Sequence, residues 1–381
     1  MKLLFALSFA VILYTYLGYP ILIALFARVF PRPWERAPWP LAQQPAPISI
    51  IMAVHNGAAM LPAKLDHLLA LEPTLVREII VISDGSTDAT NEILSQPLNP
   101  DPRLRAINLP EQVGKSAAVN HGVAEATGEI LLFVDIRPRI EPGALASLLS
   151  NFADPTVGCV AGELLLTQQG HDATASAVSG LYWRYEQYIR NCEAAVDSPV
   201  GVYGGFYAIR RACAVQAPPG LILDDMFQPL AIIRQGFRSV LDRQALVTDI
   251  WPSKATGEFS RKVRTLAGNF QLIQLAPWIL GPSNRVLFQL VSHKLLRLAV
   301  PYFFLLLLVT SPWPFAVLQL LFWLMAAIAI RHRIPVLQRI AAPASALLVL
   351  NAAAVVGLYT FLFTRGPLWR IWSPTAAPSD P

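Results

Sequence analysis

The chain has 381 residues, of which 54% are hydrophobic and only 14% are charged. Soluble domains carry about a quarter charged residues, so this composition argues against an ordinary soluble enzyme and favours an integral membrane protein. The net charge of +5 is modest, and no basic stripe interleaved with aromatic residues appears, which argues against a nucleic-acid partner. The three cysteines stand far apart without a CxxC pair, which indicates ordinary thiols rather than a disulfide framework or a zinc site.

The first thirty residues predict a transmembrane helix, because Leu3–Ala27 carries no charge and is long enough to cross the hydrocarbon core. Arginines follow this stretch at once, which places its C-terminal end in the cytoplasm. The six prolines of residues 31–47 then predict a stiff linker.

Two further uncharged stretches lie near the C-terminus. Leu298–Ile330 is interrupted at Ser311–Pro314, where the prolines predict a tight turn between two short spans. Ile340–Thr364 predicts a third span. Between the middle of the chain and these spans, the pattern from Phe270 to Ile279 suits a helix on the membrane surface, with an amphipathic core helix as an equal alternative.

The middle of the chain alternates predicted strands and helices. Near-continuous apolar strands separated by helices predict a parallel sheet that is covered on both faces. Ligands of such sheets bind beyond the carboxyl ends of the strands, so polar residues at those ends should share one site. The expected strands are Ile48–Val54, Glu78–Ser83, Leu104–Leu109 and Glu129–Val134, and the polar residues at their ends are His55, Asn56, Asp84 and Asp135.

The expected organisation therefore has six parts. They are a transmembrane helix in residues 1–30, a proline-rich linker in 31–47, an α/β domain in 48–268, interfacial helices in 269–297, about three transmembrane helices in 298–364 and a tail in 365–381.

Several short motifs follow one another through residues 48–268. They are Val54-His-Asn56, Ser83-Asp-Gly-Ser-Thr-Asp88, Gly114-Lys115, Phe133-Val-Asp135, Gly204-Gly205, Asp224-Asp225 and Arg261-x-x-Arg264. In this order they resemble the family 2 glycosyltransferases, which are inverting enzymes that use nucleotide sugars. The resemblance is to the bacterial membrane-bound synthases of poly-N-acetylglucosamine, cellulose and hyaluronan. It implies a Rossmann-like GT-A domain in the cytoplasm, held to the bacterial inner membrane by several transmembrane helices.

The resemblance also implies a set of residues that bind the donor, namely Val54, Asn56, Asp84, Lys115 and Asp135. Asp84 would accept hydrogen bonds from a uracil ring or a ribose, and a helix-capping turn with Asp88 is the alternative. Lys115 would lie near the nucleotide, and a surface lysine that opens a helix is the alternative.

Family members carry Asp-x-Asp for a divalent ion, whereas this chain has Asp135-Ile136-Arg137. One carboxylate together with the oxygens of the diphosphate can still hold Mg²⁺ or Mn²⁺, so we expect the metal at Asp135. Arg137 could instead supply part of the positive charge of the metal.

Asp224-Asp225 is a paired carboxylate that can take a proton from a sugar hydroxyl. The second carboxylate can raise the pKa of its neighbour toward neutrality. The resemblance makes Asp225 the general base. The alternative is the acidic first turn of a helix, which is compatible with this role.

Arg261 and Arg264 lie three residues apart, and therefore on one face of a helix. The family usually shows Gln-x-x-Arg-Trp here, so Arg261 replaces the glutamine and Thr265 the tryptophan. Arg264, together with Arg261, would stabilise the departing diphosphate. A basic face that touches anionic lipid is the alternative.

Gly204 and Gly205 are expected where an acceptor sugar approaches the backbone closely, with tight packing as the alternative. A group of aromatic residues at helical spacing favours core packing, with stacking on sugars as the alternative. This group is Tyr182, Trp183, Tyr185 and Tyr188.

Together these features predict an enzyme that moves a hexosyl or N-acetylhexosaminyl group from a nucleotide sugar, expected to be UDP-linked, to a hydroxyl with inversion. We expect a role in exopolysaccharide or cell-envelope glycan synthesis, with the sugar donor, a glycan or lipid acceptor, membrane lipid and other secretion subunits as partners. The alternatives are transfer of a single sugar to a lipid, and an inactive nucleotide-binding subunit of a secretion complex.

Overall fold

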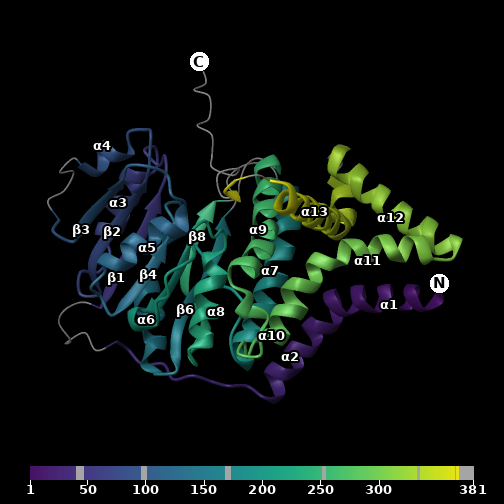
Figure 1. Cartoon of the computed structure of the whole chain (residues 1–381), viewed down its shortest axis with the longest axis horizontal. Coiled ribbons are helices and arrows are strands. Elements are labelled where there is room, and N and C mark those ends of the chain that lie inside the picture. Colours follow the sequence, from purple (N-terminus) through teal and green to yellow (C-terminus); the bar gives the residue numbers. More distant parts are fainter. Residues whose placement is uncertain are drawn as a thin grey trace.

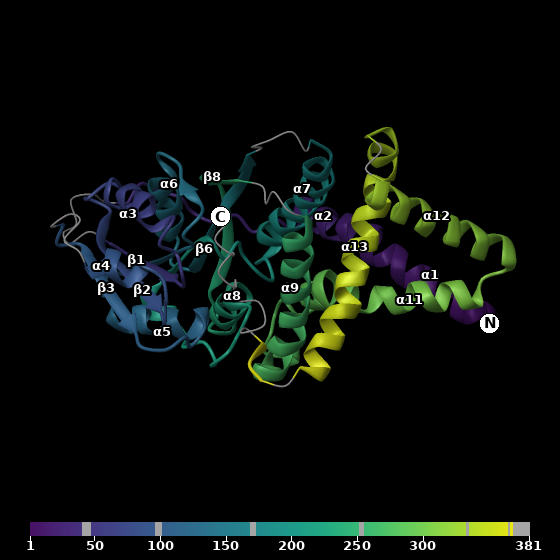
Figure 2. The same ribbon diagram turned by 90° about the horizontal axis from the view of Figure 1, so that it is seen from above.

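The computed structural model describes residues 1–39, 47–95, 101–167, 173–250, 255–332, 335–364 and 366–368. The mixed β-sheet lies at one end of the molecule and the long apolar helices lie at the other (Figures 1 and 2). Helices α7 (Ala173–Val196) and α9 (Ala255–Leu275) stand between these two parts.

One half of the sheet is parallel. Strands β1 (Ile48–Val54), β2 (Val76–Asp84), β3 (Leu104–Leu109) and β4 (Ile130–Val134) are arranged in the order β3-β2-β1-β4. Each adjacent pair runs in the same direction. The sequence prediction is confirmed for these four strands, whose observed bounds lie within two residues of the expected ones.

The prediction of a wholly parallel sheet is wrong for the other half. Strand β7 (Phe206–Arg210) runs antiparallel to β4 and to β6 (Val157–Thr167). Strand β6 is parallel to β8 (Arg238–Ile250), and the short β5 (Arg139–Ile140) is antiparallel to β8. The chain enters β7 beside the end of β4, where Asp135 N donates to Gly205 O at 3.2 Å, so β7 has to run back along β4.

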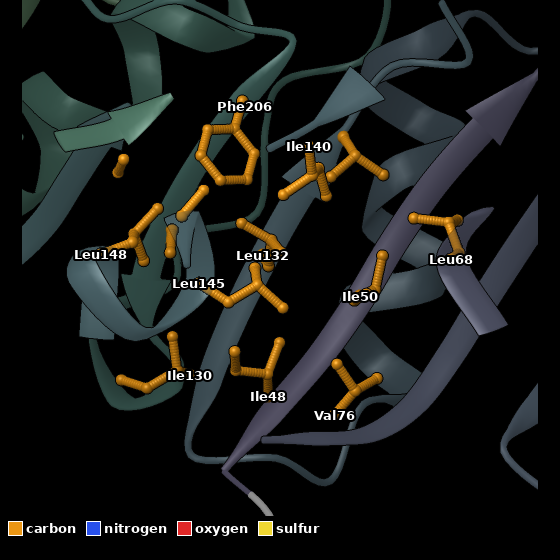
Figure 3. Close-up of a cluster of buried hydrophobic side chains, with 14 of the residues drawn as sticks. Ile48, Ile50, Leu68, Val76, Ile130, Leu132, Ile140, Leu145, Leu148 and Phe206 are labelled. Carbon is orange, nitrogen blue, oxygen red and sulfur yellow. The ribbon is translucent and has the colours of Figure 1, made fainter. Parts of the chain in front are cut away.

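Helices cover both faces of the sheet. One face packs against α3 (Leu61–Leu69) and α6 (Ala144–Ser150), and Figure 3 shows strand residues such as Leu132 meeting Leu145 and Leu148 there. The other face packs against α5 (Lys115–Glu125) and α8 (Asp224–Arg234). Because both faces are covered, the strands need apolar residues at consecutive positions, which explains the continuous apolar runs of β1, β2 and β4. The short helix α4 (Thr90–Ser95) follows β2.

Four helical runs are long and apolar enough to cross a membrane, namely Lys2–Val29, Leu287–Thr310, Trp313–Ile330 and Pro343–Phe363 among the described residues. They comprise α1 (Lys2–Leu13) with α2 (Tyr19–Val29), α10 (Leu287–Gln289) with α11 (Leu296–Thr310), α12 (Trp313–His332) and α13 (Pro335–Phe363). One such run precedes the sheet and three follow it, as expected. The predicted turn at Ser311–Pro314 separates α11 from α12. The second run begins at Leu287, inside the stretch that was expected to hold interfacial helices.

Helix α9 crosses the expected domain boundary at residue 268 and continues to Leu275. Leu272 and Ile279 are each 1% exposed and pack in one cluster with apolar residues of α8. Phe270 stacks on Phe361 of α13, with ring centroids 5.8 Å apart. These contacts show that the apolar face of this segment packs against the protein, and a position on the membrane surface stays a prediction. Of the expected tail, only residues 366–368 are described, and residues 40–46 of the linker lie outside the described residues.

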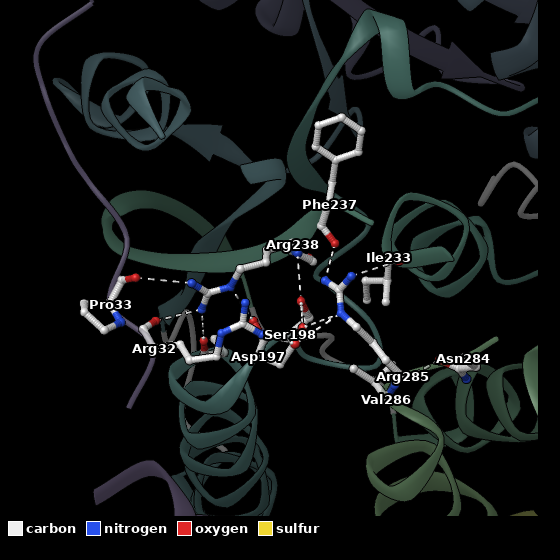
Figure 4. Close-up of polar contacts among 12 residues, drawn as sticks. Arg32, Pro33, Asp197, Ser198, Ile233, Phe237, Arg238, Asn284, Arg285 and Val286 are labelled. Atoms are coloured by element: carbon white, nitrogen blue, oxygen red, sulfur yellow. Dashed lines mark hydrogen bonds and ion pairs between the residues drawn. The ribbon is translucent and has the colours of Figure 1, made fainter. Parts of the chain in front are cut away.

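A polar cluster around Asp197 ties the membrane part to the sheet (Figure 4). The Asp197 carboxylate accepts hydrogen bonds from Arg32 at 2.7 Å and from Arg285 at 3.1 Å. Arg238, at the start of β8, is 3% exposed and donates to the backbone oxygens of Arg32 and Pro33. The chain that leaves the first membrane helix, the end of α7, the sheet and the segment before α10 therefore meet at one point.

Replacing Asp197 with alanine should lower the thermal unfolding midpoint of the protein in detergent. Arg285 would lose its carboxylate partner in a partly buried place, at a cost of roughly 2–4 kcal/mol. The matched control is Asp66→Ala, which removes an exposed carboxylate from α3 and should leave the midpoint unchanged. Equal midpoints for both variants would show that this cluster does not tie the two parts together.

Candidate active site

The ends of the parallel strands and the start of α8 bring four charged residues together. Lys115, the first residue of α5, places its Nζ 2.8 Å from Asp135 Oδ1 and 3.9 Å from Asp224 Oδ2. Asp135 directly follows β4, and Asp224 and Asp225 form the first turn of α8. The structure thus brings together residues from three distant places in the sequence, at 115, 135 and 224–225, and their roles toward a donor and an acceptor stay predictions.

Lys115 holds its proton firmly in this setting. Burial by itself would lower the pKa of Lys115, but the carboxylates of Asp135 and Asp224 outweigh that effect and raise it. The lysine is therefore a fixed positive charge at physiological pH. Such a charge, at the N-terminus of a helix, suits an anionic phosphate group.

Asp225 is a carboxylate with an unusual affinity for protons. Burial, and then the neighbouring charge of Asp224, raise its pKa to about 6, while Lys115 and Arg190 oppose the shift. A group with this pKa is mostly ionised at pH 7 and is a stronger base than an ordinary aspartate. Its place in the first turn of α8 also favours the ionised form, which confirms the helix-start alternative, and the general-base role stays a prediction that is compatible with it.

Gly204 lies directly against Asp225. A Cβ atom on Gly204 would stand 2.9 Å from Asp225 Cβ and 3.0 Å from its Oδ2, so only glycine leaves this carboxylate its present position. Val202 N also donates to Asp225 O at 3.0 Å. Gly205 contacts the other side of the site, because its carbonyl oxygen accepts from Asp135 N. Tight packing is thus real at Gly204, and contact of its backbone with an acceptor sugar stays a prediction.

The Asp84 side chain is bound to the backbone of a neighbouring loop. It is 3% exposed, and its two carboxylate oxygens accept hydrogen bonds from Val113 N at 2.7 Å and Gly114 N at 3.0 Å. Gly85 has φ +58° and approaches the same loop so closely that a Cβ there would lie 2.2 Å from Gln112 N. Asp84 therefore holds the loop that leads into Lys115. The capping role belongs to Asp88, whose Oδ1 accepts from Thr90 N at 3.0 Å at the start of α4.

The two remaining donor candidates on β1 and after it are also engaged with the protein. Asn56 adopts φ +51°, and its Oδ1 accepts a hydrogen bond from Thr87 N at 2.8 Å, which fixes the loop after β1 to the loop after β2. Val54 is 4% exposed and packs in the core. A donor could therefore meet Val54 only through its backbone. Contact of these residues with a nucleotide stays a prediction.

Arg137, which stands where the family motif Asp-x-Asp has its second aspartate, forms an ion pair with Asp249. Arg137 Nη2 donates to Asp249 Oδ2 at 2.7 Å, and Asp249, on β8, is 7% exposed. No group of three His, Cys, Asp or Glu residues that could hold a metal ion occurs within the described part of the chain. The Asp135 side chain is 43% exposed, so it remains accessible although Lys115 contacts one of its oxygens. These residues fit an ion that takes one protein carboxylate and its other ligands from the diphosphate and water.

Arg261 and Arg264 lie on the face of α9 that meets the segment leading to Asp224. Gly268, one turn beyond Arg264, packs so closely that a Cβ there would lie 2.8 Å from Leu223 Cγ. By helix periodicity the two arginines share the face of α9 that carries Gly268, and their contact with a diphosphate stays a prediction.

The sequence did not predict the residues that hold the backbone of the segment immediately before Asp224. Ser116 Oγ donates to Leu221 O at 2.6 Å, and Asn120 exchanges two hydrogen bonds with the backbone of Ala217. From the other side, Gln271 accepts from Ile222 N at 3.0 Å and donates to Gly220 O at 2.8 Å. The only available signal was the i, i+4 spacing of Ser116 and Asn120 directly after Lys115.

The chain was compared with known proteins. Residues 49–215 match the family model for Glycosyl transferase family 2. A dolichyl-phosphate beta-glucosyltransferase of Trichomonas vaginalis is 32% identical over 28% of this chain and 34% of its own length. An N-acetylglucosaminyltransferase of Rhizobium meliloti is 23% identical over 76% of this chain and 72% of its own. A poly-beta-1,6-N-acetyl-D-glucosamine synthase of Staphylococcus aureus is 22% identical over 59% of this chain and 55% of its own length.

Among solved structures, a mannosyltransferase of Pyrobaculum calidifontis in complex with GDP-Man and Mn²⁺ has the same fold. Its TM-score is 0.69 at 21% identity, over 94% of this chain and 99% of that one. The present chain spans about a third of the first curated relative and little more than half of the Staphylococcus synthase. The family match over residues 49–215 and the shared fold agree with the resemblance seen in the motifs: the chain contains a domain that matches Glycosyl transferase family 2 and has the GT-A fold.

Proposed function

We propose that the protein moves a hexosyl or N-acetylhexosaminyl group from a nucleotide sugar to a hydroxyl with inversion. The protein is bound to the bacterial inner membrane, and the reaction takes place on the cytoplasmic side. The product is a cell-envelope glycan or an exopolysaccharide. The observation that carries this proposal is the carboxylate of Asp225, whose pKa is raised to about 6 and which packs directly against Gly204. The cationic Lys115 lies on the other side of the carboxylate pair.

In the proposed reaction, Asp225 takes the proton from the acceptor hydroxyl as that oxygen attacks the anomeric carbon on the face opposite the diphosphate. Lys115 and Arg264, aided by Arg261, stabilise the negative charge that develops on the leaving diphosphate. A bound Mg²⁺ or Mn²⁺ would supply further positive charge to the diphosphate. Asp135 would hold that ion, and Arg137 is kept in place beside it by Asp249.

A UDP-sugar is the expected donor, and the names of two relatives favour an N-acetylglucosamine group. The Mn²⁺ and GDP-Man of the mannosyltransferase with the same fold support use of a divalent ion and make GDP-sugars the donors to test beside UDP-sugars. Membrane lipid and other secretion subunits remain proposed partners.

A second candidate is transfer of one sugar to a lipid acceptor. Two observations favour it: the relative named as a dolichyl-phosphate glucosyltransferase, and Thr265 in place of the tryptophan of the family motif. The Thr265 hydroxyl is bonded to Arg261 O at 3.0 Å and offers no flat surface for a sugar ring. The size of the product separates the two candidates.

Replacing Asp225 with asparagine should abolish most transfer while leaving donor binding intact. Loss of a general base typically costs about 10²–10⁴-fold in rate. The measurement is nucleotide release in lipid nanodiscs from a panel of UDP- and GDP-sugars with Mg²⁺ or Mn²⁺, with Asp66→Asn as the matched control. The proposal would be contradicted if the Asp225 variant released nucleotide from a productive donor as fast as the control.

The rate of transfer should depend on pH through Asp225. Because the pKa of this carboxylate is raised to about 6, it carries a proton below that pH and cannot act as a base. We expect kcat/KM to be constant above about pH 7 and to fall about tenfold per pH unit below pH 6. An unperturbed aspartate would keep the rate constant down to about pH 4. A profile that is flat to pH 4.5 would therefore exclude Asp225 as the group that titrates.

A further inference from the structure

Asp249 lies at the same edge of the sheet as the candidate active site. Strand β8 is parallel to β6, and β7 is antiparallel both to β6 and to β4, so β8 runs in the same direction as β4. Asp249 is the next-to-last residue of β8, and Asp135 directly follows β4. Both carboxylates therefore lie at the carboxyl ends of strands, where ligands of such sheets bind.

Arg137 lies in the segment that joins these two strand ends. The chain leaves β4 at Asp135 and forms β5 beside β8, where Arg139 is paired with Thr248. The Arg137 Nη2 donates to Asp249 Oδ2 at 2.7 Å. The Asp249 side chain is 6% exposed, whereas the Arg137 side chain is 40% exposed. The buried carboxylate thus orients the guanidinium, which has several N–H donors, and leaves part of it accessible to a ligand.

Asp249 has a second cation nearby. Lys64, on α3, is 5% exposed, and its Nζ donates to Pro138 O. Burial lowers the pKa of Lys64 to about 8, and the carboxylates of Asp135 and Asp249 oppose that change, so the amine is close to both. Lys64 therefore holds the segment that contains Arg137 and helps to balance the charge of Asp249. The charge of Arg137 is thus not consumed by this carboxylate alone and is available to an anion.

Tyr203 places Arg137 in the same surroundings as Lys115. Burial raises the pKa of the Tyr203 hydroxyl, and the carboxylates of Asp135 and Asp249 raise it further. Arg137 and Lys115 lower the pKa of the same hydroxyl. Two cations from separate segments therefore lie near Tyr203 and Asp135. A diphosphate, whose charge is spread over two phosphate groups, suits such an arrangement.

We infer that Arg137 binds the diphosphate of the nucleotide-sugar donor, with Asp249 as the positioning residue that orients its guanidinium. The inference rests on the proposed function, because it adds two residues to the donor site of the same reaction. At the position of the second carboxylate of Asp-x-Asp, this chain offers the diphosphate a fixed positive charge. Arg137 and Lys115 then hold the diphosphate together, both in the bound donor and as it leaves.

The test measures binding of UDP and GDP to the full-length protein in nanodiscs with Mg²⁺, by calorimetric titration. Arg137→Gln should weaken binding of the preferred diphosphate about tenfold, because a charge-assisted hydrogen bond to phosphate is lost. Arg137→Lys keeps the charge without the planar fork and should restore part of the affinity. The matched control is Arg139→Gln, which removes an exposed arginine two residues further along the chain and should leave the affinity unchanged.

The role of Asp249 is tested by a double-mutant cycle. Asp249→Asn should weaken binding of the same diphosphate about threefold, because Arg137 loses the group that orients it. In the Arg137→Gln protein the same change should have no effect on binding, since no guanidinium remains to be positioned. Equal effects of Asp249→Asn in both proteins would show that Asp249 acts on the fold and not through Arg137.

The outcomes separate this inference from the proposed function. Weaker diphosphate binding for Arg137→Gln, with partial recovery for Arg137→Lys and an unchanged thermal midpoint, supports the inference even if no sugar is transferred. Nucleotide release that depends on Asp225, combined with unchanged UDP and GDP affinity for Arg137→Gln, would overturn the inference and leave the proposed function standing. An equal loss of affinity for Arg139→Gln would also overturn it, because the effect would then reflect only the net charge of the surface. Failure of the unaltered protein to bind either diphosphate at millimolar concentration would overturn both.

Discussion

The ion pair between Lys115 and Asp135, with Asp224 beside it, is the constraint around which the site is organised. The three residues come from α5, the end of β4 and the start of α8. Removing Lys115 would take away the cation that lies 3.9 Å from the buried Asp224 carboxylate, so this contact favours the present positions of α5 and α8. Asp84 stabilises this arrangement, because its carboxylate accepts hydrogen bonds from the backbone of the loop that immediately precedes Lys115.

The candidate catalytic pair Asp224-Asp225 is also linked to the helices that are long and apolar enough to cross a membrane. Ser116 and Asn120 of α5 hold one side of the segment before Asp224, and Gln271 of α9 holds the other. Helix α9 in turn packs closely on α13, where a Cβ on Gly357 would lie 3.1 Å from Ala267 N. A shift of the membrane helix α13 would thus reach Asp224 and Asp225 through a single intervening helix.

The sequence predicted those features that depend on local pattern. Continuous apolar runs and the polar residues at their ends located β1 to β4, and the acidic pair located the start of α8. It did not predict the antiparallel return of β7, since strand direction depends on where the chain re-enters the sheet. It also could not locate partners brought in from distant elements, such as Asp249 for Arg137 or Gln271 for Ile222.

The central claim is that Asp225 deprotonates a hydroxyl that displaces the diphosphate in one step. The most direct measurement is the anomeric configuration of the new glycosidic bond, read by proton NMR coupling constants on product made from an α-linked nucleotide sugar. A single displacement predicts a β-linked product. An α-linked product would contradict the account, because retention requires either a second displacement or attack from the face of the leaving group, and neither uses Asp225 as described.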